Sequence, residues 1–65
     1  MRYAIYPNPR GVHGWTRWMN YAAKHDADLS YDAERRTWFT EVKTHADYAE
    51  RCGMLVASIE EVPFQ

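Results

Sequence analysis

The chain is poor in several features on which whole classes of protein depend. Its single cysteine, Cys52, cannot form a disulfide within the chain, which predicts a reducing, cytoplasmic setting. No apolar run approaches the ~20 residues that cross a membrane. The first residues also lack the apolar stretch of a signal peptide. These absences exclude a disulfide-stapled scaffold and predict a protein that acts away from membranes.

Excess charge of either sign is also missing. Eight basic and nine acidic residues give a net charge of −1. Nucleic-acid-binding modules are usually strongly basic, because phosphate contacts dominate their affinity. We therefore expect nucleic acid to be an unlikely partner, whereas binding of another protein carries no such requirement.

The length of 65 residues predicts one small domain over residues 1–65. A domain of this size buries only about 60% of the surface that its unfolded chain exposes. Aromatic residues are plentiful, at 15% of the chain, and large rings bury much area per residue. We expect these rings to complete the core.

Hydrophobic periodicity predicts six elements. Segments of alternating strand-forming residues and segments with the apolar spacing of a helix follow one another along the chain. Pro7 ends the first strand, and Gly53 follows the second helix. The expected elements are a strand at 2–6, a helix from 15 to about 25–28, a hairpin over 28–42, a short helix at 45–52 and a strand at 54–62.

The order strand, helix, strand, strand, helix, strand is typical of the ferredoxin-like α+β fold. In that fold a four-stranded antiparallel sheet carries both helices on one face. The second helix is the weaker element, and without it the sequence would fit another α+β layout with one helix on a small sheet.

Local patterns predict how the helices sit. The apolar stripe of the first helix is expected at five positions, with Tyr21 facing elsewhere: Trp15, Trp18, Met19, Ala22 and Ala23. Thr44, with Asp47 three residues later, resembles a capping box that starts the second helix. The hairpin turn contains no glycine, which favours a loop of more than two residues.

One face of such a sheet remains uncovered by helices. Trp38 and Phe39 are adjacent in one strand, so their rings point to opposite faces. We expect the open face to hold Tyr6, one of these two rings, and Val56. This face either binds a partner or is covered by the tail 63–65. An aromatic open face resembles that of the RNA-recognition module, which implies single-stranded nucleic-acid binding as one alternative.

The loop between the first strand and the first helix is the second candidate. Arg10 and His13 lie on it, before a helix start, where backbone N–H groups favour anions. The run "RGVHGWTRW" is similar to the phosphate cradle of acylphosphatases, with Val12, Gly14 and Arg17 in order and His13 where that family has glutamine. The similarity implies an anion-binding or acylphosphatase-like domain that uses residues 7–17. The plainer interpretation is that the prolines and glycines only form a turn.

No pattern predicts a catalytic residue, a metal site or a cofactor. His13, His25, His45 and Cys52 are the possible zinc ligands, but none forms the tight pair that structural zinc sites show. We expect Cys52 to be a small buried apolar residue.

The sequence favours a protein-interaction module that is not an enzyme. We expect it to bind another protein or a nucleoprotein complex, although an edge strand or an open face would equally serve a homodimer. Small domains of this kind resemble inhibitors from bacteriophages and mobile elements, which block a host machine by occupying its surface. The residues expected to bind the partner are Tyr6, Arg10, His13, Arg35, Arg36 and Trp38.

Overall fold

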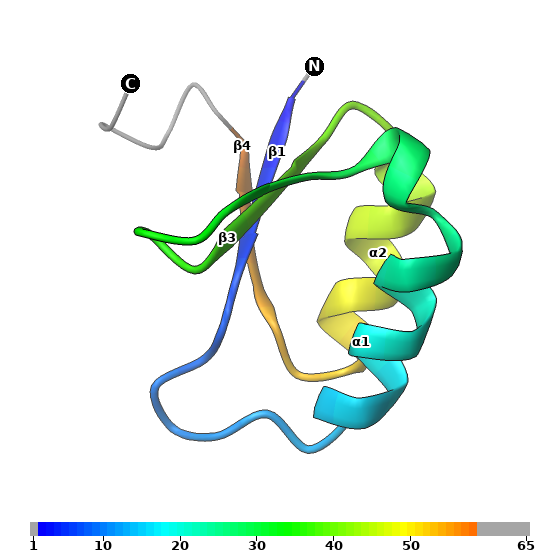
Figure 1. Cartoon of the computed structure of the whole chain (residues 1–65). Coiled ribbons are helices and arrows are strands. Elements are labelled where there is room, and N and C mark those ends of the chain that lie inside the picture. Colours follow the sequence, from blue (N-terminus) through cyan, green and yellow to red (C-terminus); the bar gives the residue numbers. More distant parts are fainter. Residues whose placement is uncertain (1, 59–65) are drawn as a thin grey trace.

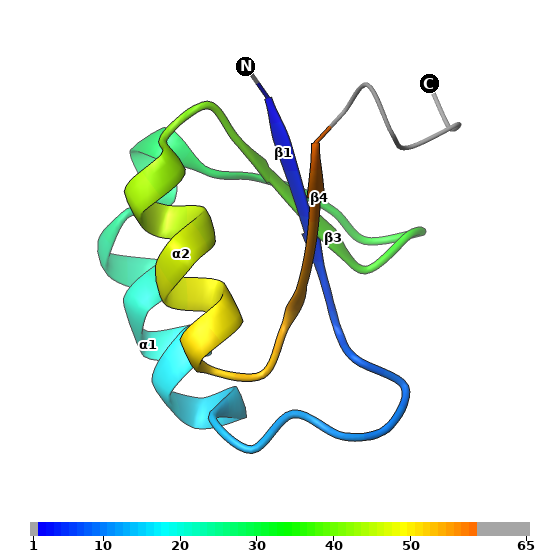
Figure 2. The same cartoon turned by 180° about the vertical axis from the view of Figure 1, so that it is seen from behind.

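The computed structural model describes residues 2–58 and has the ferredoxin-like order of elements. In chain order these are β1 (Tyr3–Tyr6), α1 (Trp15–Lys24), a short 3-10 helix η1 (Asp26–Asp28), β2 (Ser30–Asp32), β3 (Thr37–Thr40), α2 (Lys43–Arg51) and β4 (Leu55–Ser58). The strands form one antiparallel sheet in the order β2-β3-β1-β4. Both helices lie on the same side of this sheet (Figures 1 and 2). The predicted fold class is therefore confirmed.

The register of the sheet decides which aromatic ring faces the helices. Ile5 pairs with Trp38 on one side and with Val56 on the other, so these three side chains share a face. All three pack in the core beneath the helices. Phe39 therefore lies on the open face. The prediction that Val56 lies on the open face is wrong, because β4 presents Leu55 and Ala57 there instead.

The core is centred on Trp18 of α1. Its ring is fully buried and meets Trp38 edge-on, with the ring centroids 5.7 Å apart and the planes at 90°. The predicted stripe is correct for Trp18 and Ala22. It is wrong for Trp15, Met19 and Ala23, which are exposed, and for Tyr21, which turns inward and stacks on Tyr48 of α2. A tyrosine can bury its ring while its hydroxyl keeps a hydrogen-bond partner. The inward face of α1 therefore includes Tyr21, and the helix is rotated toward α2.

The ends of the remaining elements follow local chemistry. The capping prediction for Thr44 is wrong, because α2 begins at Lys43 and its N-cap is Val42, without a side-chain cap. Gly53 has a φ of +89°, as expected just after a helix. The hairpin loop spans 33–36, longer than two residues as predicted. The rest of the predicted last strand, and the tail 63–65, lie outside the described residues.

The loop between β1 and α1 is hydrogen-bonded to the end of α2. The Gly14 N–H donates to the carbonyl oxygen of Cys52 at 2.9 Å, and this contact holds the start of α1 against the end of α2. A Cβ atom built at Gly14 would lie 3.0 Å from the Cys52 Cα atom. The φ of Gly14 is −114°, which any residue can adopt, so backbone conformation does not explain the glycine. The close approach of the two backbones does.

We expect Gly14→Ala to destabilise the protein by about 1–3 kcal/mol, because the added methyl group overpacks a backbone contact. The measurement is urea unfolding followed by circular dichroism. Asn20→Ala, at an exposed position of α1, is the matched control and should change the free energy of unfolding by less than about 0.5 kcal/mol. Equal stability of the wild type and Gly14→Ala would contradict this role for Gly14.

Candidate functional site

Large apolar side chains are exposed along the side of the molecule where α1 lies over the hairpin. We call Trp15, Met19 and Tyr31, together with the Trp38 ring beneath them, the aromatic edge. The exposed fractions of the first three are 42%, 41% and 53%. Trp38 connects Trp15 and Tyr31, since its ring centroid lies 6.0 Å from that of Trp15 and 4.6 Å from that of Tyr31. Exposed apolar patches of this kind mark interaction surfaces.

The charges on the α1 side of the aromatic edge are basic, whereas Asp32 follows Tyr31 directly on the hairpin side. Every acidic residue of the sequence follows Lys24, so α1 and the segment before it carry positive charge alone. A hollow beside Trp15 is lined by His13, Arg17 and Asn20. Charge of one sign next to an apolar patch selects partners of the opposite sign.

The structure separates the six residues that were expected to bind a partner. Trp38 is only 7% exposed and supports the aromatic edge from below, so its ring is not open to a partner. Tyr6 lies half-buried on the opposite, open face. The other four are exposed and fall in two groups. Arg10 and His13 lie in the loop before α1, and Arg35 and Arg36 lie in the hairpin turn.

The hairpin turn is held by Asp32. Its carboxylate accepts the backbone N–H groups of Glu34 and Arg35 and forms a 2.9 Å ion pair with the Arg35 guanidinium. Arg36 follows with a φ of +51°, in the left-handed region that non-glycine residues rarely adopt. Arg35 is thus engaged within the turn, and Arg36 takes the backbone position where a glycine would be usual.

On the open face, Arg2 lies over the half-buried ring of Phe39. The guanidinium carbon of Arg2 lies 5.1 Å from the centroid of the Phe39 ring, within the range of a cation–π contact. Ala4, between the two neighbouring strands, is fully buried. The open face therefore offers a partner less free aromatic surface than the aromatic edge does.

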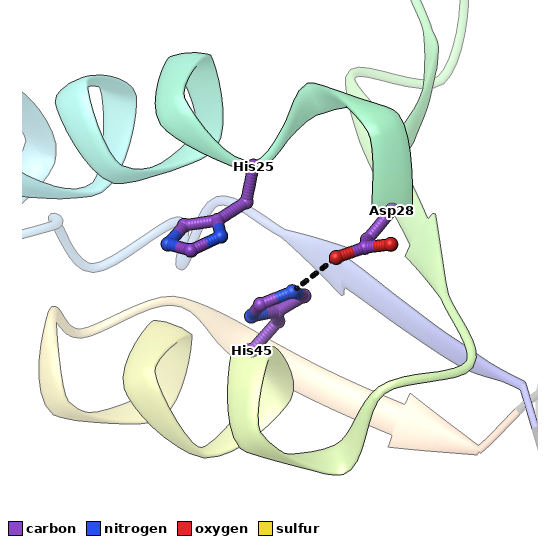
Figure 3. A group of neighbouring side chains, drawn as sticks. All are labelled: His25, Asp28 and His45. Carbon is purple, nitrogen blue, oxygen red and sulfur yellow. Dashed lines mark hydrogen bonds and ion pairs between the residues drawn. The ribbon is translucent and has the colours of Figure 1, made fainter.

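A polar cluster lies at the other end of α1. It consists of His25, which caps that helix, Asp28 of η1, and His45 in the first turn of α2 (Figure 3). One potential ligand atom from each of the three lies within 4.8 Å of the other two. His45 is buried, and its Nε2 atom lies 3.1 Å from the Asp28 carboxylate. Three segments of the chain thus converge on one point.

Tyr21 completes the environment of His45. Its hydroxyl lies 2.6 Å from the Nδ1 atom of His45. Burial, and to a lesser degree Tyr48 and Asp28, raise the pKa of the Tyr21 hydroxyl, so that it keeps its proton at neutral pH. The Tyr21 hydroxyl can therefore donate to Nδ1 while the Nε2–H group donates to Asp28. Both nitrogens of a buried imidazole are satisfied in this way.

Three backbone N–H groups of the loop before α1 already donate hydrogen bonds within the protein. The N–H group of Gly11 donates to the Asn8 carbonyl, that of Arg10 to the Asn8 side chain, and that of Gly14 to Cys52. An anion cradle requires amides that are free to donate to the ligand. The three bonds favour the plainer interpretation of the loop as a turn.

Cys52 is fully buried, as the sequence predicts. Burial raises the pKa of its thiol, while the charge of Arg17 acts in the opposite direction. A thiol that stays protonated is a poor nucleophile and a poor metal ligand.

Sequence reasoning missed three features of the candidate sites. Asp28 was not considered with His25, although the two stand three positions apart around a helix end, because only cysteine and histidine pairs were weighed. The separation of charge along the chain is also visible in the sequence, but the balanced total conceals it. The exposure of Trp15 had no signal, since it depends on the rotation of α1.

The fold and these side chains define a small ferredoxin-like domain with an aromatic edge and a separate His–Asp cluster. Comparison of the chain with family models, curated proteins and solved structures finds no match. Within residues 2–58, no helix has the length and apolar character that crossing a membrane would require.

We expect Tyr21→Phe to lower the free energy of unfolding by about 1–3 kcal/mol, because His45 Nδ1 loses its buried partner. Tyr31→Phe removes the same atom from an exposed ring and should cost less than about 0.5 kcal/mol. Urea unfolding at pH 7 measures both. If the two variants lose equal stability, the hydrogen bond to His45 is not a stabilising contact.

Proposed function

We propose that the protein is an interaction module that binds a partner protein through its aromatic edge. The observation that carries the proposal is the exposure of Trp15 and Tyr31 around one shared ring, with Met19 exposed four residues after Trp15 on α1. Apolar side chains that are exposed side by side favour a binding role. Aromatic side chains and methionine are enriched where proteins meet.

The charge pattern supports one kind of occupant. The partner segment that fits is apolar, with aspartate or glutamate beside its apolar side chains. Its apolar groups would cover Met19 and Tyr31, and its carboxylates would face Arg17 and His13 in the hollow beside Trp15. A protein segment can supply both features, whereas single-stranded nucleic acid supplies stacking bases with a phosphate at every nucleotide.

The residues expected from the sequence enter this proposal in part. His13 and Arg10 contribute positive charge near the start of α1, and Arg36 contributes it at the hairpin turn. Trp38 acts as the support of the edge. The expected mode of action is retained within the proposal, namely inhibition of a host macromolecular machine by occupation of its surface, as in proteins from phages and mobile elements.

Site-specific photocrosslinking tests the surface. Benzoylphenylalanine is placed at Tyr31 on the aromatic edge, at Tyr6 on the open face, or at exposed Glu50 on α2 as background. In cells that express the protein, we expect a discrete protein adduct from position 31 that is absent from position 50. Mass spectrometry should map the crosslink to an apolar segment with acidic residues beside it.

Binding to the mapped partner segment then tests the side chains. Met19→Glu should weaken binding at least tenfold, since it adds a charge of the same sign as the partner's carboxylates. Glu50→Gln is the matched control on α2 and should bind as the wild type does. Crosslinks from position 6 instead of 31, adducts with nucleic acid, or undiminished binding by folded Met19→Glu would each overturn the proposal.

A further inference from the structure

The His25–Asp28–His45 cluster has the chemistry of a metal site rather than of a simple polar contact. Two imidazoles and one carboxylate converge from the end of α1, from η1 and from α2 (Figure 3). The end of α1 and η1, which follow each other in the chain, and the distant α2 thus bring nitrogen and oxygen donors close together. The His25 ring also packs against Tyr21 and His45, with its centroid 4.4 Å and 4.7 Å from theirs.

We propose that His25, Asp28 and His45 bind a zinc ion. Zinc takes imidazole nitrogen and carboxylate oxygen at about 2.0–2.2 Å, which places neighbouring ligand atoms of a tetrahedron roughly 3.3 Å apart. The His45 Nε2 atom and the Asp28 carboxylate already lie 3.1 Å apart. All three donor atoms fall within 4.8 Å of one another. A small movement of the half-buried His25 side chain completes the set.

The proton arrangement at His45 is suited to this role. Without metal, Nε2–H donates to Asp28 and Nδ1 accepts from the Tyr21 hydroxyl. When zinc takes the Nε2 lone pair, the ring proton stands on Nδ1 and is donated to the Tyr21 oxygen, which turns from donor to acceptor. The ring stays neutral and keeps its orientation. A histidine that binds zinc usually donates its other ring N–H group to a hydrogen-bond acceptor in this way.

The donor set and the exposure of the site point to zinc with an open coordination position. The Asp28 side chain is 52% exposed and that of His45 only 8%, so an ion enters from the Asp28 side and water can fill the fourth position. Calcium and magnesium prefer all-oxygen sites, which this cluster cannot provide. The C-terminal end of α1, next to His25, also favours positive charge.

Zinc binding is measured with tag-free protein by competition against a chromophoric chelator, with Co²⁺ absorption as a report of the ligand geometry. We expect one zinc ion per chain. His25→Ala and Asp28→Asn should each weaken binding at least tenfold, and Tyr21→Phe by about 10–100-fold. His13→Ala removes an exposed histidine at the opposite end of α1 and should bind zinc as the wild type does.

Histidine resonances in NMR spectra identify the ligands independently. On addition of zinc, the imidazole signals of His25 and His45 should shift with the same stoichiometry, and those of His13 should not. Three results would overturn the proposal: no zinc or cobalt binding by folded protein, an equal loss in His13→Ala and His25→Ala, or binding that is unchanged in both His25→Ala and Asp28→Asn. Each would leave the cluster as a hydrogen-bonded support of α2.

Discussion

The contact between Trp18 and Trp38 is the interaction on which the rest of this structure depends. It joins α1 to the sheet, edge to face, with both rings buried. Such aromatic pairs contribute about 0.5–1.5 kcal/mol beyond the area that they bury. In a chain of 65 residues, a single pair of this size forms a large part of the core. The position of α1 over β3 follows from it.

Because α1 is held near its middle, its two ends are placed as well. Its first residue, Trp15, reaches over Trp38 and forms the aromatic edge with Tyr31. Its last turn brings Tyr21 against Tyr48 and His25 beside His45. Trp15 of the candidate partner surface and His25 of the candidate zinc site therefore stand at opposite ends of α1, and the same buried contact positions both.

The sequence predicts what depends on local chemistry. Alternation, helical spacing and a few special residues, such as Pro7 and Gly53, locate the elements, and their order leads to the ferredoxin-like fold. The strand pairing was needed to show that Trp38 rather than Phe39 faces the helices, because adjacent aromatic residues fit either orientation. The inward turn of Tyr21 depends on its partners on α2, which are distant in sequence.

The candidate sites were less accessible to sequence reasoning than the fold. Exposed hydrophobic residues such as Met19 have the same spacing as buried ones, so periodicity assigns them to the core. Asp28 lies among other acidic residues and looks like part of a solvated rim until α2 brings His45 to it. A residue that is brought in from a distant element, as His45 is in the candidate zinc site, leaves no local pattern beside His25 and Asp28.

The placement of α1 is the central claim, and solution NMR tests it most directly. Nuclear Overhauser effects should connect the Trp38 ring with those of Trp18, Trp15 and Tyr31 in the same spectrum that connects β1 with β3. They should also connect Tyr21 with Tyr48. A folded sheet that shows its own cross-strand effects but none between Trp18 and Trp38 would contradict the account.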